Sequence, residues 1–131
     1  MTKPLVYLAG AMTHVPNRDE DWRNEATRLL APEFDVLDPT KMEKGEWTPD
    51  EIVSYDYGCI LRAKFVLVRA QVPSWGTAME LAFARHHLTP VVAWDCPQGK
   101  VSPWLIAHVD QNFPNLYMLA EVVRISKGLF R

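Results

Sequence analysis

The chain has 131 residues, enough for one domain with a sizeable core, and we treat 1–131 as that single domain. Hydrophobic residues make up 48% and charged residues 23%, a composition typical of ordinary globular proteins. The formal net charge of -2 provides no positive field for a phosphate backbone. We therefore expect a small-molecule ligand and no nucleic acid polymer as partner.

Two further features concern the membrane and the cellular compartment. No apolar stretch approaches the roughly 20 residues of a membrane-spanning helix, so we expect no membrane partner. The two cysteines, Cys59 and Cys96, lie far apart in the sequence and have neither a zinc-binding nor a redox spacing. We therefore expect reduced thiols in a cytoplasmic protein.

Short apolar runs alternate along the chain with segments in which apolar residues recur at a helical spacing. The first run ends at Gly10, and Thr48 and Pro49 are typical capping and first-turn residues of a helix. In chain order we predict a strand over 5–9, a helix over 19–30, a strand over 34–37, a helix over 49–63, a strand over 65–68, a helix over 77–87, a strand over 90–94, a short helix over 103–109, a strand over 116–118 and a helix over 119–127.

Strands that alternate with helices pair in parallel through right-handed crossovers. The pattern therefore predicts an α/β fold of the doubly wound, Rossmann-like or flavodoxin-like kind. We expect a five-stranded, mostly parallel sheet with helices on both faces. Ligands of such sheets bind beyond the carboxyl ends of the strands, where the turn at Gly10 and the turn at Ser74 would meet.

The segment 73–81, with the sequence PSWGTAMEL, is the most informative part of the chain. It joins the third predicted strand to its helix through small residues, a place where α/β proteins bring a ligand close to their backbone. Gly76 would allow that approach. The segment also places Glu80 on an otherwise apolar stretch, where it is either a catalytic carboxylate or a residue on the solvent-facing side of the helix.

Two more polar residues are expected near the same edge. Tyr7 lies close to the carboxyl end of the first predicted strand, and Asp56 lies in the middle of the second predicted helix. Each has a simpler interpretation, because Tyr7 can be a core tyrosine with a hydrogen-bonded hydroxyl and Asp56 can face the solvent. Together with Glu80 they indicate a catalytic site.

Three short motifs, in this order and spacing, resemble the nucleoside 2-deoxyribosyltransferase superfamily, which includes nucleoside 5′-monophosphate N-glycosidases. They are YLAG at 7–10, SYD at 54–56 and SWGTAMEL at 74–81. The start YLAGAMT at 7–13 is also similar to small phage-type proteins grouped with the superfamily. The resemblance covers the chain from Tyr7 to about Asn112.

The resemblance implies cleavage of an N-glycosidic bond. Glu80 would be the nucleophile that attacks the anomeric carbon, and the Tyr7 hydroxyl would fix its rotamer. Asp56 matches the carboxylate that contacts the leaving base and transfers a proton to it. Water as the second reactant makes the enzyme a hydrolase, and a second base makes it a transferase.

Two positions bear on the substrate. Ser74 stands where the phosphate-accepting N-glycosidases carry serine, which favours a nucleotide over a nucleoside. Asn112 resembles the transferases at the position where the superfamily reaches into the neighbouring subunit's site, which implies a homodimer. Because the Ser74 motif aligns without gaps, we favour a hydrolase acting on a nucleoside 5′-monophosphate or nucleoside, with base exchange by a deoxyribosyltransferase as the alternative.

The remaining expectations concern aromatic residues, metals and cofactors. Trp75 and Trp47 could sandwich a base, although tryptophans are more often core or interface residues. The sequence has no metal-binding histidine spacing, no Walker loop and no dinucleotide fingerprint, so we expect neither a metal nor a cofactor. A different class of function also stays open, a non-catalytic module that binds nucleotides.

Overall fold

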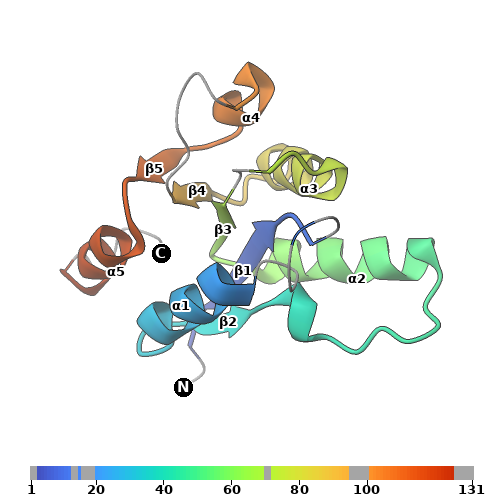
Figure 1. Ribbon diagram of the computed structural model, residues 1–131, viewed down its shortest axis with the longest axis horizontal. Coiled ribbons are helices and arrows are strands. Elements are labelled where there is room, and N and C mark those ends of the chain that lie inside the picture. The colour runs from blue at the N-terminus through green and yellow to red at the C-terminus, as the bar shows by residue number, and fades with distance from the viewer. Residues whose placement is uncertain (1–2, 13–14, 16–19, 70–71, 95–100, 126–131) are drawn as a thin grey trace.

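The protein is a five-stranded sheet with helices on both sides, seen in a computed structural model that describes residues 3–12, 15, 20–69, 72–94 and 101–125 (Figure 1). The strand order is β2-β1-β3-β4-β5, and each of the neighbouring pairs is parallel. This confirms the predicted α/β class. The order reverses between β1 and β3, and a reversal of this kind is where doubly wound sheets form their ligand crevice.

The bounds of the elements follow the predicted alternation closely. In chain order the elements are β1 (Leu5–Gly10), α1 (Glu20–Leu30), β2 (Asp35–Leu37), the short 3-10 helix η2 (Pro39–Lys41), α2 (Pro49–Arg62), β3 (Phe65–Arg69), α3 (Trp75–His86), β4 (Val91–Trp94), α4 (Pro103–Ala107), β5 (Gln111–Phe113) and α5 (Leu116–Ile125). Helix α3 begins two residues earlier than predicted. The turn between β3 and α3 is therefore shorter, and Gly76 lies in the first turn of the helix.

The prediction of the fifth strand is wrong. Residues 116–118 begin α5, and the strand that pairs with β4 is the polar segment Gln111–Phe113. The reason lies in burial, because Leu116 and Leu119 are buried while Tyr117 and Met118 are exposed. That spacing is helical, and a window of three apolar residues does not distinguish it from a strand.

Helices α2 and α3 each begin at a residue whose side chain caps the helix. At α2 the Thr48 hydroxyl accepts a hydrogen bond from the Glu51 amide at 3.2 Å, and the Glu51 carboxylate accepts one from the Thr48 amide at 3.0 Å. At α3 the Ser74 hydroxyl oxygen accepts a hydrogen bond from the Thr77 amide at 3.3 Å. Ser74 therefore marks the first residue before α3, at the helix end that attracts anions.

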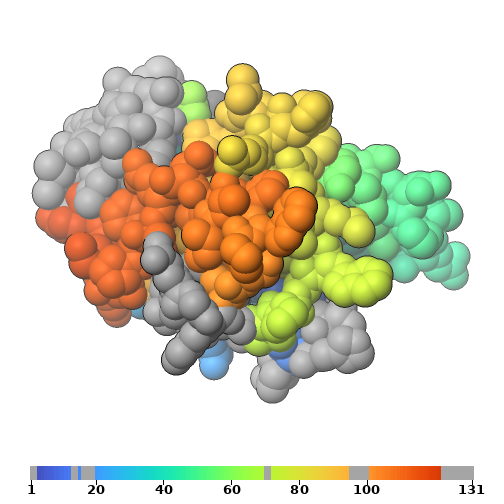
Figure 2. All heavy atoms as spheres, turned by 90° about the horizontal axis from the view of Figure 1, so that it is seen from above, coloured from blue at the N-terminus to red at the C-terminus, as the bar shows by residue number. Residues whose placement is uncertain are grey.

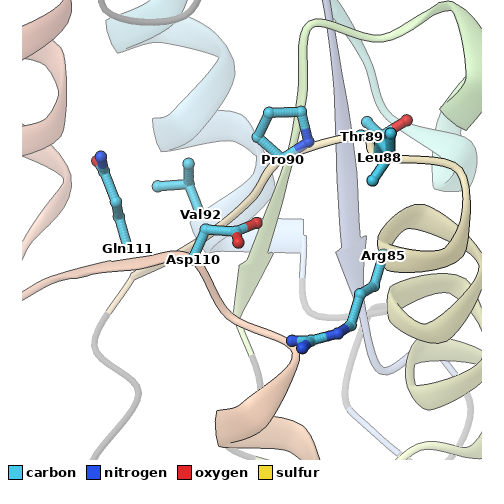
Figure 3. Close-up of a pocket in the computed structure, with 7 residues that line it drawn as sticks. All are labelled: Arg85, Leu88, Thr89, Pro90, Val92, Asp110 and Gln111. Carbon is cyan, nitrogen blue, oxygen red and sulfur yellow. The ribbon is translucent and has the colours of Figure 1, made fainter.

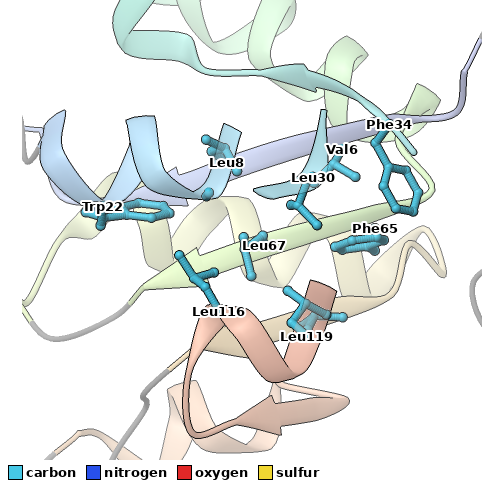
Figure 4. Close-up of a cluster of buried hydrophobic side chains, with 11 residues drawn as sticks. Val6, Leu8, Trp22, Leu30, Phe34, Phe65, Leu67, Leu116 and Leu119 are labelled. Carbon is cyan, nitrogen blue, oxygen red and sulfur yellow. The ribbon is translucent and has the colours of Figure 1, made fainter. Parts of the chain in front are cut away.

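Two hydrophobic clusters lie on opposite faces of the sheet. The first lies beneath α1 and α5 (Figure 4) and consists of Val6, Leu8, Trp22, Ala26, Leu30, Phe34, Phe65, Leu67, Val92, Leu116 and Leu119. The second lies beneath α2 and α3 and consists of Tyr7, Ala9, Cys59, Ile60, Val66, Val68, Leu81, Ala84, Val91 and Ala93. Because side chains alternate along β1, Val6 and Leu8 enter the first cluster and Tyr7 the second.

The structure bears on the expected absence of a membrane span and on the expected reduced cysteines. Within the described residues, no helix has the length and apolarity needed to cross a bilayer. Cys59 is a buried free thiol, whereas Cys96 lies outside the described residues, so reduced cysteines in a cytoplasmic protein stay a prediction.

Candidate active site

Tyr7, the third residue of β1, meets Glu80 on the side of the sheet that α3 covers. Tyr7 is fully buried, and its hydroxyl donates a short hydrogen bond to Oε2 of Glu80 on α3. The pleat of β1 turns Tyr7 toward α3, and the helical register of α3 turns Glu80 back toward the sheet. Of the two interpretations of Glu80 that the sequence left open, this geometry favours a carboxylate held toward the sheet over one on the solvent-facing side of the helix.

The second predicted carboxylate, Asp56, is held by a lysine that no sequence motif indicates. The ammonium Nζ of Lys44 donates to both carboxylate oxygens of Asp56, at 2.7 Å and 2.9 Å. Both side chains are only 16% exposed. Lys44 belongs to the segment between η2 and α2, so this ion pair fastens that segment to α2.

Asp56 and Glu80 line the same pocket, a cavity of about 270 Å³ between α2, α3 and the end of β1. Its lining residues are Gly10, Met12, Ile52, Val53, Asp56, Tyr57, Ser74, Gly76, Thr77, Met79 and Glu80. A second cavity of about 480 Å³ is lined by residues 39–45 and shares Met12, Ile52 and Asp56 with the first. The two cavities are therefore compartments of one crevice, with Asp56 at their boundary.

The electrostatics of the pocket centre on Glu80. Burial raises the pKa of Glu80 to about 7. The hydrogen bond from Tyr7 lowers the pKa, the negative charge of Asp56 raises it, and the positive charges of Arg23 and Lys44 lower it. The pKa of Tyr7 is raised far above its usual range, first by burial and then by the charge of Glu80. Tyr7 is therefore a permanent donor, and Glu80 changes its charge near neutral pH.

Arg23 is a second residue beside the candidate site that the sequence analysis missed. Its side chain is fully buried, forms an ion pair with Asp38 at 3.1 Å, and donates to the carbonyl oxygens of Leu8 at 3.3 Å and Gly10 at 2.9 Å. Strand β2 ends at Leu37 opposite Tyr7, so the later carbonyls on that side of β1 have no strand partner. Arg23 takes the place of that strand and so fixes the end of β1.

The two predicted glycines have different reasons to be glycine. A Cβ at Gly10 would lie 2.8 Å from Cζ2 of Trp22 and 3.2 Å from the carbonyl oxygen of Arg69, so Gly10 is needed for packing. A Cβ at Gly76 would meet nothing within 4 Å. Because Gly76 lines the pocket, the space beside its Cα is open to a ligand.

Three predicted site residues are not brought to this pocket. Trp47 is 37% exposed and packs edge-on against Tyr55, with ring centroids 5.4 Å apart. Trp75 is 85% exposed at the start of α3. Asn112 lies in β5, the edge strand, which β3 and β4 separate from β1. Their roles stay predictions, and the sandwich of a base between the two tryptophans finds no support in this geometry.

A larger hollow of about 530 Å³ lies at the opposite edge of the sheet, at the amino ends of β4 and β5 (Figure 3). Its polar groups already serve the fold. The Asp110 carboxylate accepts a hydrogen bond from the Val91 amide at 2.7 Å, and the Arg85 guanidinium donates to the carbonyl of Ala107. The charged side chains of this hollow therefore bind backbone groups, whereas the pocket at the carboxyl edge is lined by the carboxylates of Asp56 and Glu80.

The arrangement suits acid–base and nucleophilic chemistry more than metal chemistry. Across the described ranges, no group of three or more His, Cys, Asp or Glu side chains is placed to hold a metal ion. What the pocket does offer is a carboxylate oriented by a phenol and a second carboxylate paired with an ammonium. A pair of carboxylates in unlike environments is the usual arrangement for cleaving a glycosidic bond.

No protein-family model and no curated protein matches the chain by sequence. Solved structures do match its fold. The chain is similar to a 2-deoxyribosyltransferase from Bacillus psychrosaccharolyticus, with a TM-score of 0.70, 18% identity and coverage of 88% of this chain and 90% of that one. It is also similar to a CMP N-glycosidase from Clostridium botulinum, with a TM-score of 0.64, 14% identity and coverage of 93% and 98%.

DNA processing protein A from Helicobacter pylori, described for its single-stranded DNA binding mode, shares the fold as well. Its TM-score is 0.67 at 10% identity, with coverage of 95% of this chain and 82% of that one. The likeness to deoxyribosyltransferase and N-glycosidase structures that the motifs predicted is confirmed at the level of the fold. Since one fold carries unrelated functions, the pocket must decide between them.

Proposed function

We propose that the protein cleaves the N-glycosidic bond of a nucleoside 5′-monophosphate or nucleoside through Glu80 and releases the base. One observation carries this proposal. A partly buried carboxylate, oriented by the fully buried hydroxyl of Tyr7, shares a pocket with a second carboxylate, Asp56. The similar 2-deoxyribosyltransferase and CMP N-glycosidase structures add weight to this reaction class.

The sugar would occupy the smaller compartment. There Glu80 faces the anomeric carbon, on which positive charge develops as the base departs. The ionised carboxylate stabilises this charge and then forms an ester with the sugar. Because the pKa of Glu80 is about 7, a large fraction is ionised at neutral pH, and the cationic transition state favours that form further.

The base would occupy the larger compartment, lined by residues 39–45 and bounded by Asp56. This places Asp56 on the base side and Glu80 on the sugar side of the bond that breaks, as the resemblance implies. The ion pair with Lys44 keeps Asp56 fixed before the substrate arrives.

A 5′-phosphate would lie at the amino end of α3. Ser74 caps this helix and lines the pocket, and Gly76 leaves open space within the first turn. A helix N-terminus with a hydroxyl group is a good site for a dianionic phosphate. This supports a nucleotide substrate over a nucleoside.

A homodimer is supported by the apolar surface over α3 and α4. Trp75 and Trp104 are 85% and 80% exposed, and an apolar groove of about 260 Å³ lies between the two helices. Figure 2 views the molecule from the side on which these helices lie together. We expect sedimentation velocity to give a dimer for the native protein and a monomer for Trp104→Ser. A native monomer at high concentration would contradict the proposed dimer.

A base-release assay over a panel of nucleosides and nucleoside 5′-monophosphates tests the proposed reaction. We expect free base from at least one member of the panel, and no release by Glu80→Ala. Binding of panel members without base release would instead support a non-catalytic nucleotide-binding module. Adding a second free base distinguishes the two enzymes, since exchange products identify a transferase and free sugar or sugar phosphate a hydrolase.

A further inference from the structure

Lys44 lines the larger compartment and is bonded to Asp56, which lines both compartments. Its ammonium donates two hydrogen bonds to Asp56, and within the described residues it has no other hydrogen-bond partner. An ammonium has three N–H groups, so one is left for a ligand. Lys44 also lines the larger compartment, and its side chain is only 16% exposed, so this donor is held beside the space assigned to the base.

The ion pair changes what Asp56 can do. An ammonium at 2.7 Å and 2.9 Å from the two oxygens interacts best with the carboxylate anion. A carboxylate in that form has no proton to give to a leaving base. The group of the pair that carries protons is Lys44.

We propose that Lys44, held in place by Asp56, is the catalytic residue that donates a proton to the departing base. The inference rests on the proposed function, and it moves the proton transfer that the resemblance implied for Asp56 to its partner. Asp56 then acts as a positioning residue that aims the ammonium and balances its charge.

The two half-reactions are balanced in atoms and electrons. In the first, an oxygen of Glu80 bonds to the anomeric carbon, the bond to the base nitrogen breaks with its electron pair passing to the base, and a proton moves from Lys44 Nζ to the base. In the second, a water oxygen bonds to the anomeric carbon, the ester to Glu80 breaks, and the proton that water loses returns to Lys44. Glu80 is again a carboxylate and Lys44 an ammonium.

Two other cations among the described residues near the crevice have partners of their own. Lys41 pairs with Glu20 at 2.8 Å through side chains about half exposed to solvent. Arg23 is bound by Asp38 and by two backbone carbonyls of β1, on the opposite face of the sheet from the pocket. Lys41 also lines the larger compartment, but its half-exposed ammonium is paired with Glu20, whereas two hydrogen bonds to Asp56 hold Lys44 in place.

The test compares an ordinary substrate with one whose base needs no proton. For a purine substrate the second compound is its N7-methylated form, whose base leaves neutral, and for a pyrimidine substrate it is the 5-fluoro derivative, whose base leaves more readily. We expect Lys44→Met to lower kcat on the ordinary substrate at least about 100-fold. On the activated substrate the loss should be about tenfold or less. Lys44→Arg keeps the charge and donors and should recover part of the loss.

Lys64→Met is the matched control, because this exposed lysine precedes β3 at the opposite edge of the sheet. It should leave both substrates unaffected. Thermal unfolding of each variant checks that the fold is intact. Equal losses by Lys44→Met on the two substrates would overturn the assignment of Lys44 and leave the proposed function standing.

Asp56→Asn decides between the members of the pair. If Asp56→Asn spares the activated substrate while Lys44→Met does not, Asp56 is the proton donor and the inference is wrong. If native protein releases base from no substrate, the proposed function fails and the inference with it.

The pH profile gives an independent measurement. The groups that act on Glu80 come from four parts of the fold, namely Tyr7 on β1, Arg23 on α1, Lys44 before α2 and Asp56 on α2. Since Lys44 lowers the pKa of Glu80, its loss should move the acid limb of kcat/KM to higher pH. Lys44→Arg should leave that limb in place, and a limb unmoved by Lys44→Met would contradict the proposed contact across the pocket.

Discussion

The Tyr7 hydroxyl donates its hydrogen bond to Glu80 from a side chain with no exposed surface. The donor is therefore fixed by the packing of the sheet, while the acceptor lies at the wall of the pocket. The rotamer of the proposed nucleophile is thus set before any ligand binds, and the most direct tests of the site change one of these two side chains.

Tyr7→Phe should move the acid limb of the activity profile to higher pH. The hydrogen bond from Tyr7 lowers the pKa of Glu80, so its removal raises that pKa above about 7. A hydrogen bond to a charged group is worth about 1.5–3 kcal/mol, which corresponds to about one to two pH units. The measurement is kcat/KM as a function of pH. Tyr117→Phe removes the same atom at an exposed site on α5 and should leave the profile unchanged.

Glu80→Gln should abolish base release and make the fold more stable at alkaline pH. The folded pKa of Glu80 is raised from 4.5 to about 7, so its contribution to stability is present below pH 4.5 and lost as pH rises through 7. Glutamine has no such loss, and its carbonyl still accepts from Tyr7. Denaturant unfolding should show a gain on the order of 3 kcal/mol at pH 8 and little difference near pH 4.5. Equal stabilities at both pH values would contradict the buried charge.

Gly76→Ala should separate stability from activity. A Cβ at this position meets no protein atom, and alanine is favoured over glycine in a helix by about 1 kcal/mol, so the melting temperature should hold or rise. The methyl group would nevertheless occupy space beside the proposed sugar and phosphate, so KM should rise. Gly58→Ala is the matched control, because its Cβ also meets nothing and it does not line the pocket. An unchanged KM for Gly76→Ala would remove this residue from the site.

Gly10→Ala should destabilise the fold rather than block the ligand. The added Cβ would lie 2.8 Å from Trp22, a ring buried in the first cluster, and 3.2 Å from a backbone carbonyl of β3. Overpacking of this kind costs about 1–3 kcal/mol. Denaturant unfolding measures the loss. A stable variant that fails to bind nucleotides would instead show that Gly10 acts at the ligand.

Local sequence signals were enough for most of the fold. The Thr48 and Pro49 pair marks the start of α2, and the alternation of apolar runs with helical segments gives the parallel sheet. The strand Gln111–Phe113 was missed because its stability comes from backbone pairing with β4, which polar side chains do not reveal. Because the true fifth strand was missed, the strand was wrongly predicted at 116–118, where α5 begins.

The site was predictable only where short motifs carry it. Tyr7, Asp56 and Glu80 stand in segments whose neighbours point to them, and the structure places Asp56 and Glu80 in one pocket, with Tyr7 bonded to Glu80 from the core. Lys44 and Arg23 have no such signal. Their contacts join residues 12 or more positions apart in the sequence, and a pair such as Lys44 and Asp56 becomes visible only when the chain has folded.

The hydrogen bonds from Arg23 to β1 connect the two faces of the sheet. The guanidinium comes from α1, on the face away from the proposed substrate, yet it sets the strand that carries Tyr7. The geometry of the proposed active site is thus partly determined by a helix on the opposite face of the sheet. A substitution at Arg23 would therefore be expected to shift Tyr7 and Glu80 although it changes no residue that lines the pocket.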